Sequence, residues 1–259
     1  VEAAYNFGDT QNNSMKFITD DGTGLAIDRG SRQVISNDYS GFSFNTAVNY
    51  SLLFEKHMKL DFTATYSPEV TLKNTQVSTL STVGFDSSGS LGTIDQIVSP
   101  SSKNDLIIPQ KYTFGVGYGK THKWFLGAEY TGTQNSKLNA AYNLVQNVNY
   151  EDSHRFSFGG YYTPKYNSFT SYFDKITYRI GGKYENTGLV LNNQSINDAA
   201  INVGFGLPVS FNRDQSNINL GLEYGQRGTK SNGLIKENYF NVSVGLSFND
   251  KWFQKRRYE

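Results

Sequence analysis

The sequence predicts an all-β fold, a transmembrane antiparallel β-barrel of the outer-membrane type. Short runs of alternating apolar and small or polar residues follow one another from Phe42 to Phe248, for example YTFGVGY at 112–118. Because successive side chains of a strand point to opposite faces, each run forms a strand with one apolar face. Aromatic residues make up 15% of the chain. Many lie near the ends of these runs, where the membrane–water interface favours them.

Composition agrees with such a barrel and excludes other classes. Mean hydropathy is −0.52, and no run approaches the roughly 18 to 20 apolar residues of a membrane-spanning helix. A membrane-spanning β-barrel does not raise mean hydropathy in this way, because only alternate residues of its strands meet lipid. The chain has no cysteine, which excludes disulfides and thiol chemistry. Its net charge of +1 gives no general basic surface for nucleic acid.

The alternation also predicts a topology. One or two strands within 1–19 would bring the visible total to about ten. The connections alternate between short ones, such as 55–57 and 121–122, and longer ones. Outer-membrane barrels have short periplasmic turns and long extracellular loops, so we expect the longer connections on the cell surface and the C-terminus in the periplasm. Nine further strands are predicted at 40–54, 58–71, 111–120, 123–133, 154–164, 175–187, 198–210, 216–226 and 236–249. The longer connections are 72–110, 134–153, 188–197 and 227–235.

The phase of each strand assigns its two faces. Aromatic residues at the ends of the lipid face are predicted to form interface girdles: Tyr66, Trp124, Tyr130, Tyr162, Tyr184, Tyr224, Phe248 and, beyond the last strand, Trp252. Charged residues of the opposite phase are predicted to face the lumen: Asp61, Glu129, Arg179, Lys183, Glu185 and Glu223. These charges either pair across a wet interior or contact a solute. We expect Arg179 to be neutralised by Glu223 or Glu129, because an unpaired buried charge is unfavourable.

The lumen glycines and the connections leave two interpretations open. Bare backbone leaves room for a channel, or for a plug or partner segment inside the barrel. The Ser-, Thr- and Gly-rich segment 72–110 is either a flexible surface loop or a lid or docking surface. Loop 134–153 carries apolar residues such as Leu138, Tyr142 and Leu144, so it is the better candidate for a partner contact.

The sequence predicts one barrel domain and a short C-terminal tail. Residues 1–259 are expected to form the outer-membrane barrel without its N-terminal hatch and first strands. Residues 251–259 are expected to form a periplasmic tail, anchored at the interface by Trp252 or Phe253.

Catalytic and metal-binding patterns are missing from the sequence. His57 and His122 lie in predicted turns at one end of the strands, whereas His154 lies at the other end, so they cannot share a metal ion. The glycines at 115, 117 and 119 lie within a strand and not before a helix, so they do not form a nucleotide loop. We therefore expect no enzyme, no metal and no cofactor.

Several stretches resemble the Bacteroidota branch of the FadL family over roughly residues 105–259. They are PQKYTFGVGY at 109–118, INVGFGLP at 201–208, INLGLEYGQRG at 218–228, LIKENYF at 234–240 and NDKWF at 249–253. The resemblance implies a fourteen-stranded outer-membrane barrel with an N-terminal hatch that moves hydrophobic compounds such as long-chain fatty acids. The family is also similar to accessory barrels of the PorV type, which serve protein secretion or assembly complexes.

Two functional hypotheses follow for a protein of the bacterial outer membrane. The first is a FadL-like channel for hydrophobic small molecules. The alternative is a noncatalytic accessory barrel subunit of an outer-membrane protein secretion or barrel-assembly complex. The expected partners are outer-membrane lipid, a hydrophobic small molecule and proteins docking at 72–110 and 134–153, without nucleic acid. An apolar lining of a lumen pocket would favour the channel, and a protein partner on those loops would favour the accessory barrel.

Overall fold

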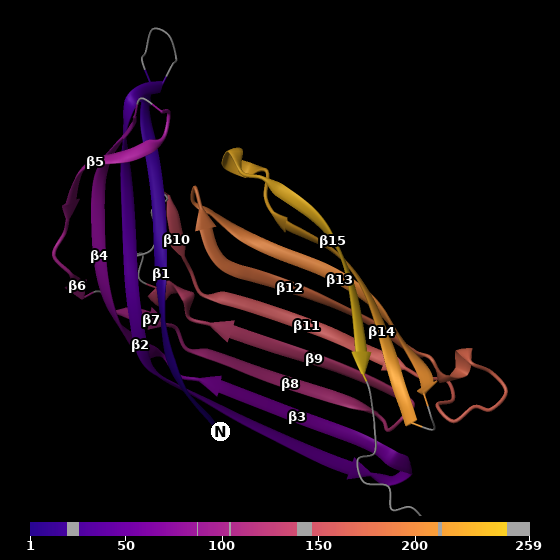
Figure 1. Cartoon of the computed structure of the whole chain (residues 1–259). Coiled ribbons are helices and arrows are strands. Elements are labelled where there is room, and N and C mark those ends of the chain that lie inside the picture. The colour runs from indigo at the N-terminus through magenta and orange to yellow at the C-terminus, as the bar shows by residue number, and fades with distance from the viewer. Residues whose placement is uncertain (20–25, 87, 104, 139–146, 212–213, 248–259) are drawn as a thin grey trace, which may run out of the picture. The chain divides into compact units, whose positions relative to one another are not determined.

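The computed structural model describes residues 1–19, 26–86, 88–103, 105–138, 147–211 and 214–247, and these residues are mostly β-strand (Figure 1). The predicted all-β antiparallel architecture is confirmed. No helix in the described ranges is long and apolar enough to cross a membrane. The strands are β1 Glu2–Thr19, β2 Ala26–Phe54, β3 Met58–Ser67, β4 Val70–Phe85, β5 Leu91–Val98, β6 Ser102–Lys103, β7 Leu106–Ile108, β8 Lys111–Lys120, β9 Trp124–Thr133, β10 Val148–Tyr150, β11 Ser153–Tyr162, β12 Thr177–Leu191, β13 Gln194–Phe211, β14 Asp214–Gly228 and β15 Lys236–Ser247. Short 3-10 turns are η1 Glu55–His57, η2 Asn135–Lys137, η4 Phe173–Lys175 and η5 Ser231–Gly233.

The chain divides into two compact units, and each is described by itself. Unit 1 comprises residues 1–45, 68–109 and 138–142. Unit 2 comprises residues 46–67, 110–137 and 143–259. Strand β2 contributes its first part to unit 1 and its last residues, from Thr46, to unit 2.

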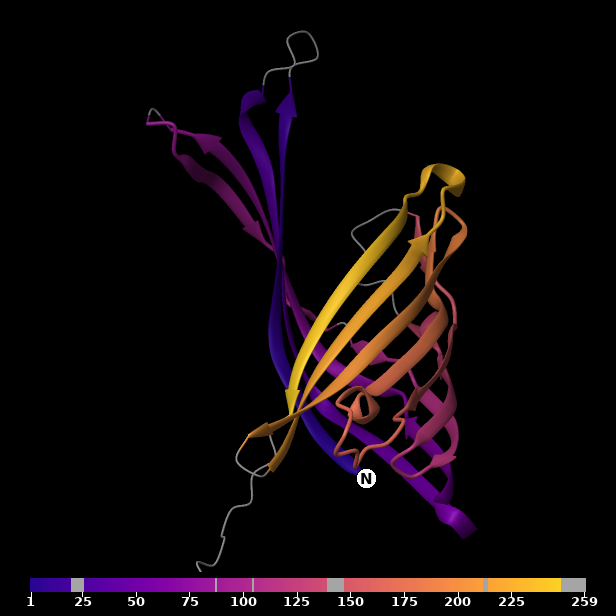
Figure 2. The ribbon, with the colours of Figure 1, turned by 90° about the vertical axis from the view of Figure 1, so that its right-hand side faces the viewer.

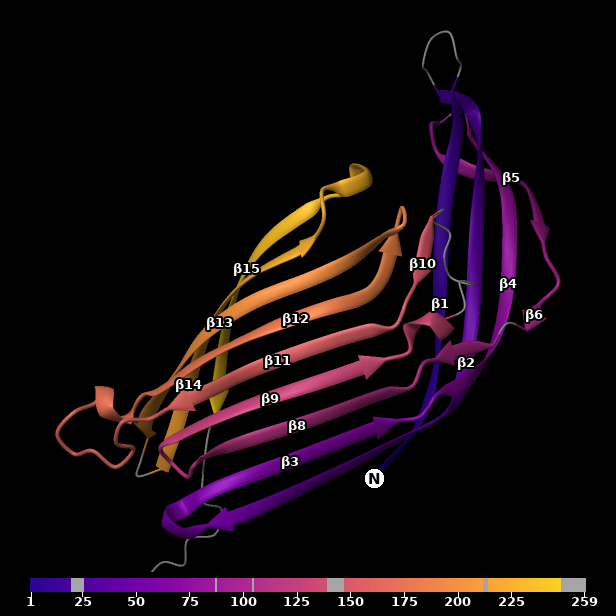
Figure 3. The same ribbon diagram turned by 180° about the vertical axis from the view of Figure 1, so that it is seen from behind.

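Unit 2 is one antiparallel sheet in the order β15-β14-β13-β12-β11-β9-β8-β3-β2 (Figure 3). Its strands match the nine strands predicted from residue 40 onward, and Figure 2 shows that they curve together into a trough. One connection is shorter than predicted. Strands β12 and β13 meet at Asn192 and Asn193, both with positive φ (47° and 59°), so a tight hairpin turn replaces the expected longer loop at 188–197.

The register of unit 2 places the apolar residues of neighbouring strands side by side. Phe158 lies opposite Ala128 on one side, and Val203 lies opposite Ile180 and Leu222. These side chains stay uncovered: Phe158 is 65% exposed and Ile180 is 67% exposed. We call this side of the sheet the apolar face and the opposite side the polar face. A continuous exposed apolar surface of this kind is the surface that a barrel presents to lipid.

Unit 1 corrects the sequence prediction for the segment 72–110. Instead of an irregular loop, the segment contains most of β4 together with β5, β6 and β7. Strand β4 pairs with β2 over Lys73–Gly84 and also with β5. Polar side chains bond between these strands, for example Asn74 Nδ2 to Asn37 Oδ1 (3.2 Å). The strands were missed because Ser, Thr and Asn interrupt the alternation of hydrophobicity in this segment.

The N-terminus is also more regular than predicted. The sequence indicated one or two strands within 1–19, and β1 runs unbroken from Glu2 to Thr19 along β2. Polar residues in the middle of β1 pair in register, such as Asn12 with Ile35. Backbone pairing with β2 therefore carries the strand through a stretch without an apolar pattern.

Some predictions fall outside the described residues. They concern Tyr142 and Leu144 in the loop 134–153, Phe248, Trp252 and the tail 251–259. The described part of that loop contains η2 and β10, and β10 pairs with β12. The docking roles proposed for 72–110 and 134–153 stay predictions.

Candidate functional site

The polar face of unit 2 is the candidate site, because it gathers the charged residues of the curved sheet. Strand phase and register place all six predicted lumen charges on this face. Glu129 in β9 lies opposite Gly115 and Ser157, and Glu223 in β14 lies opposite Asn202 and Asn241. The role of these residues in ligand or partner contact stays a prediction.

Two of the carboxylates are paired with lysines. Lys59 Nζ lies 2.8 Å from Asp61 Oδ1, and Ser51 Oγ donates to the same oxygen at 2.5 Å. Lys183 Nζ lies 3.8 Å from Glu223 Oε1, which also accepts a hydrogen bond from Asn241 Nδ2 at 3.2 Å. Charge pairing, within β3 for Lys59 and Asp61 and between β12 and β14 for Lys183 and Glu223, therefore accounts for part of the face.

The neutralisation expected for Arg179 is wrong. Within the described ranges, Arg179 forms no ion pair with a carboxylate, and Glu223 accompanies Lys183 instead. Arg179 Nη1 donates to Asn219 Oδ1 at 2.9 Å. The charge lies on an open face where water can hydrate it, so the penalty for burying an unpaired charge does not apply.

Sequence reasoning missed three polar residues that complete these networks. Tyr239 Oη donates to Asp198 Oδ1 at 2.8 Å, and Asn219 accepts from Arg179. Burial of Asp198, which is 8% exposed, makes this bond a fixed part of the face. Strand phase would have put all three on the polar face, but their partners depend on the register between strands.

Several glycines of the polar face are covered by aromatic rings. A Cβ at Gly117 would collide with the ring of Phe125, and a Cβ at Gly127 would lie 3.1 Å from it. The ring of Tyr239 covers Gly225 in the same way. Aromatic rings of the same sheet thus fill part of the space above these glycines. Less of that space remains for a channel or a plug.

Two hollows on the polar face contain charged and amide side chains among apolar residues. One lies over β12 to β15, with Arg179, Asn219 and Glu223 among its lining residues. A second lies over β3, β8, β9 and β11, with Asp61 and Arg155 in its wall. Both linings are mixed, because Val203 and Leu222 also line the first hollow and Val116 and Phe125 also line the second.

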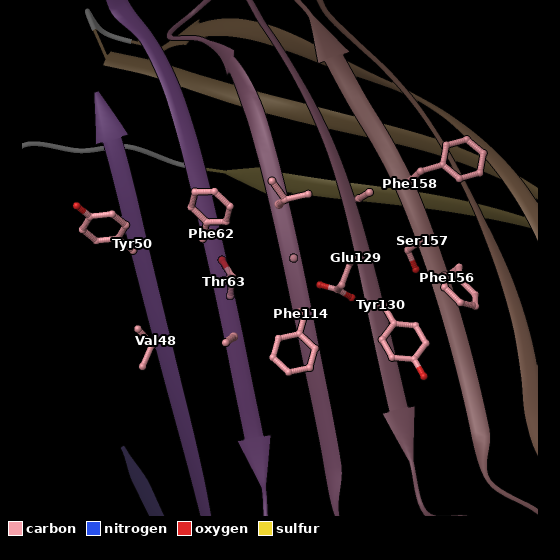
Figure 4. A pocket seen from close by; sticks show the side chains of 14 residues that line it. Val48, Tyr50, Phe62, Thr63, Phe114, Glu129, Tyr130, Phe156, Ser157 and Phe158 are labelled. Carbon is pink, nitrogen blue, oxygen red and sulfur yellow. The ribbon is translucent and has the colours of Figure 1, made fainter. Parts of the chain in front are cut away.

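The apolar hollow lies on the other side of the sheet. Phe62, Phe114, Tyr130, Phe156 and Phe158 line it together with residues of β2 (Figure 4). Its ring side chains belong to the apolar face, which is the side expected to meet lipid acyl chains. It is therefore not evidence for a solute site inside a barrel.

Six predicted interface aromatics lie on the apolar face of unit 2. Trp124 begins β9 and lies opposite Tyr162, the last residue of β11. Tyr130, toward the other end of β9, packs on Phe156 with ring centroids 4.9 Å apart, and its hydroxyl hydrogen-bonds His154 Nδ1 at 2.8 Å. An apolar ring with a bonded polar tip suits an interfacial position. The girdle itself stays a prediction.

Comparison with known proteins gives one full-length match. The model of the BamG family matches residues 1–259. The search of curated proteins found no match. Among solved structures, the CymD monoaromatic hydrocarbon channel is similar with TM-score 0.42 and 11% identity, covering 96% of this chain and 78% of that one. The RagAB peptide transporter structure is similar with TM-score 0.40 and 9% identity over 87% of this chain. This chain spans 34% of the RagAB chain.

Proposed function

The chain belongs to the BamG family, and we propose that it acts as a noncatalytic accessory β-barrel in an outer-membrane barrel-assembly complex. The family match over the whole chain is the observation that carries this proposal. A protein of this role needs a wall that is stable in lipid and surfaces for partners, and it needs no reaction centre. Within the described ranges, no three His, Asp or Glu side chains cluster as metal ligands would.

The apolar face supports a position in the bacterial outer membrane. Side chains such as Val242 and Val244 are 63% and 65% exposed. In water, an apolar surface of this kind would promote aggregation of the protein. We place the C-terminus in the periplasm. Strand β15 ends at the same side of the sheet as the short turns at Glu55–His57 and 121–123, which are typical of the periplasmic side.

A FadL-like channel for hydrophobic small molecules is the second candidate. It is favoured by the sequence resemblance over residues 105–259 and by the hollows along the glycine-containing polar face. The charged groups of Arg179 and Glu223 in the first hollow weigh against a hydrophobic solute, because such a solute would remove water from them. For that reason the accessory role ranks first.

Isolation of the native complex tests the proposal. The chain would carry an affinity tag after its C-terminus and be purified from outer membranes in a mild detergent, with quantitative mass spectrometry of the eluate. We expect barrel-assembly subunits in fixed stoichiometry with the chain. A tagged outer-membrane barrel of equal abundance is the control. Purification of the chain alone, together with solute-dependent swelling of liposomes that contain it, would favour the channel.

A further inference from the structure

Basic residues on the polar face of unit 2 generally stand next to a carboxylate. Lys183 pairs with Glu223 at 3.8 Å. The register places Arg155 opposite Glu185, and it places Arg227 between Asp198 and Glu237. A carboxylate thus generally balances each positive charge of this face. A basic residue without such a neighbour is therefore a candidate for binding a ligand.

Arg179 is the exception. Its cross-strand neighbours are Tyr161 on β11 and Gly204 on β13, and neither carries a charge. Its side chain is exposed, and its contact with Asn219 uses a neutral amide oxygen at 2.9 Å. A guanidinium has five N–H donors, so one such bond leaves most of its donors free for a ligand.

Two glycines hold the guanidinium flat against the sheet. A Cβ at Gly206 would lie 3.1 Å from Nη2 and 3.2 Å from Nη1 of Arg179, and a Cβ at Gly204 would lie 3.5 Å from its Cβ. An added Cβ at 206 would require the guanidinium to shift by a few tenths of an ångström. The backbone of Gly206 and the bond to Asn219 therefore position the guanidinium before a ligand binds.

The surroundings of Arg179 are rich in neutral amides. The hollow in which it lies is also lined by Asn202, Asn219, Asn241 and Ser243. Glu223 lies in the wall of the same hollow, paired with Lys183. A ligand with one negative charge is tolerated beside this carboxylate, whereas a dianion is repelled more strongly.

We infer that Arg179, held over Gly206 and bonded to Asn219, forms a binding site for small solutes that bear a single carboxylate. The planar guanidinium matches a carboxylate through two parallel N–H···O bonds, which a lysine cannot reproduce. The amides of the hollow supply further donors and acceptors to the rest of the solute. This site adds a ligand to the protein and is independent of the accessory role.

Titration with benzoate tests the site, with benzyl alcohol as the uncharged analogue and inorganic phosphate as the alternative anion. The full chain, refolded in detergent micelles, would be titrated by NMR at low salt. We expect benzoate to bind, and Arg179→Gln to weaken binding at least about tenfold, as loss of a charged hydrogen-bonding group does. Arg179→Lys and Gly206→Ala should each weaken benzoate binding several-fold. The first removes the two parallel N–H donors of the guanidinium, and the second displaces the guanidinium. Arg155→Gln removes the same charge outside the hollow and should leave affinity unchanged.

The outcomes separate the site from a general charge effect. Equal losses in Arg179→Gln and Arg155→Gln would overturn the inference, as would equal binding of benzoate and benzyl alcohol. Tighter binding of phosphate than of benzoate would overturn the assignment to carboxylates. Heat-modifiable migration on gels checks the folding of each variant. If Arg179→Gln does not fold, Arg179→Lys and Gly206→Ala carry the test.

Discussion

The ring of Phe125 in β9 lies over the backbone of Gly117 in the neighbouring strand β8. The same ring lies 3.1 Å from the position of a Cβ at Gly127, and it stacks on Tyr161 of β11 at 6.0 Å between ring centroids. One aromatic side chain thus covers glycines on two strands and contacts a third strand. Aromatic cover of this kind supplies the packing that a glycine in a sheet lacks.

This relationship predicts that Gly117 cannot accept a side chain. Gly117→Ala should lower the free energy of unfolding by about 1–3 kcal/mol, because the new methyl group overlaps the ring of Phe125 and forces it to move. Gly115→Ala is the matched control on the same strand and face, since its Cβ would meet its nearest atoms at 3.8 Å. Urea unfolding in lipid vesicles measures both. Equal stability of the two variants would show that Phe125 does not lie over Gly117.

The assignment of faces is tested by placing one arginine on each side of β15. Val242→Arg should destabilise the protein by about 2–4 kcal/mol, as arginine does at the centre of a lipid-facing surface. Ser243→Arg introduces the same residue on the polar face, where water hydrates it, and should cost much less. Unfolding in vesicles gives both values. A greater loss for Ser243→Arg would mean that the two faces are exchanged.

Topology follows from the ends of the strands. Single cysteines at Ser136 in η2 and Ser231 in η5 should react with an impermeant maleimide in intact cells, because these turns lie at the end of the sheet assigned to the cell surface. Cysteines at Thr121 and Asn167 lie at the opposite end and should react only after the outer membrane is opened. The reverse labelling pattern would invert the topology.

The strands of unit 2 could be predicted because lipid imposes a strict rule on them. Each spanning strand needs an apolar residue at every second position. A run such as Phe240, Val242, Val244 and Leu246 therefore predicts both the strand and which of its faces meets lipid. The strands of unit 1 follow no such rule. In β4, Ser and Thr occur on both faces, and backbone pairing with β2 determines the structure.

The candidate site was predictable only in part, for a related reason. Strand phase alone puts Arg179, Lys183 and Glu223 on one face. Which of them meet depends on the stagger of strands that lie far apart in the sequence: Arg179 and Asn219 are 40 residues apart. A single sequence gives no value for that stagger. The expected pairing of Arg179 with Glu223 failed for this reason.

Depletion of the protein tests the central claim most directly. Cells depleted of the chain would be pulse-labelled, and the conversion of other outer-membrane barrels to their heat-modifiable folded form would be followed, beside uptake of a hydrophobic solute by the same cells. An accessory barrel of the assembly complex predicts slower barrel folding with solute uptake falling only later, as other barrels are lost. Unchanged folding of other barrels, with an immediate loss of hydrophobic solute uptake, would contradict the account and favour a channel.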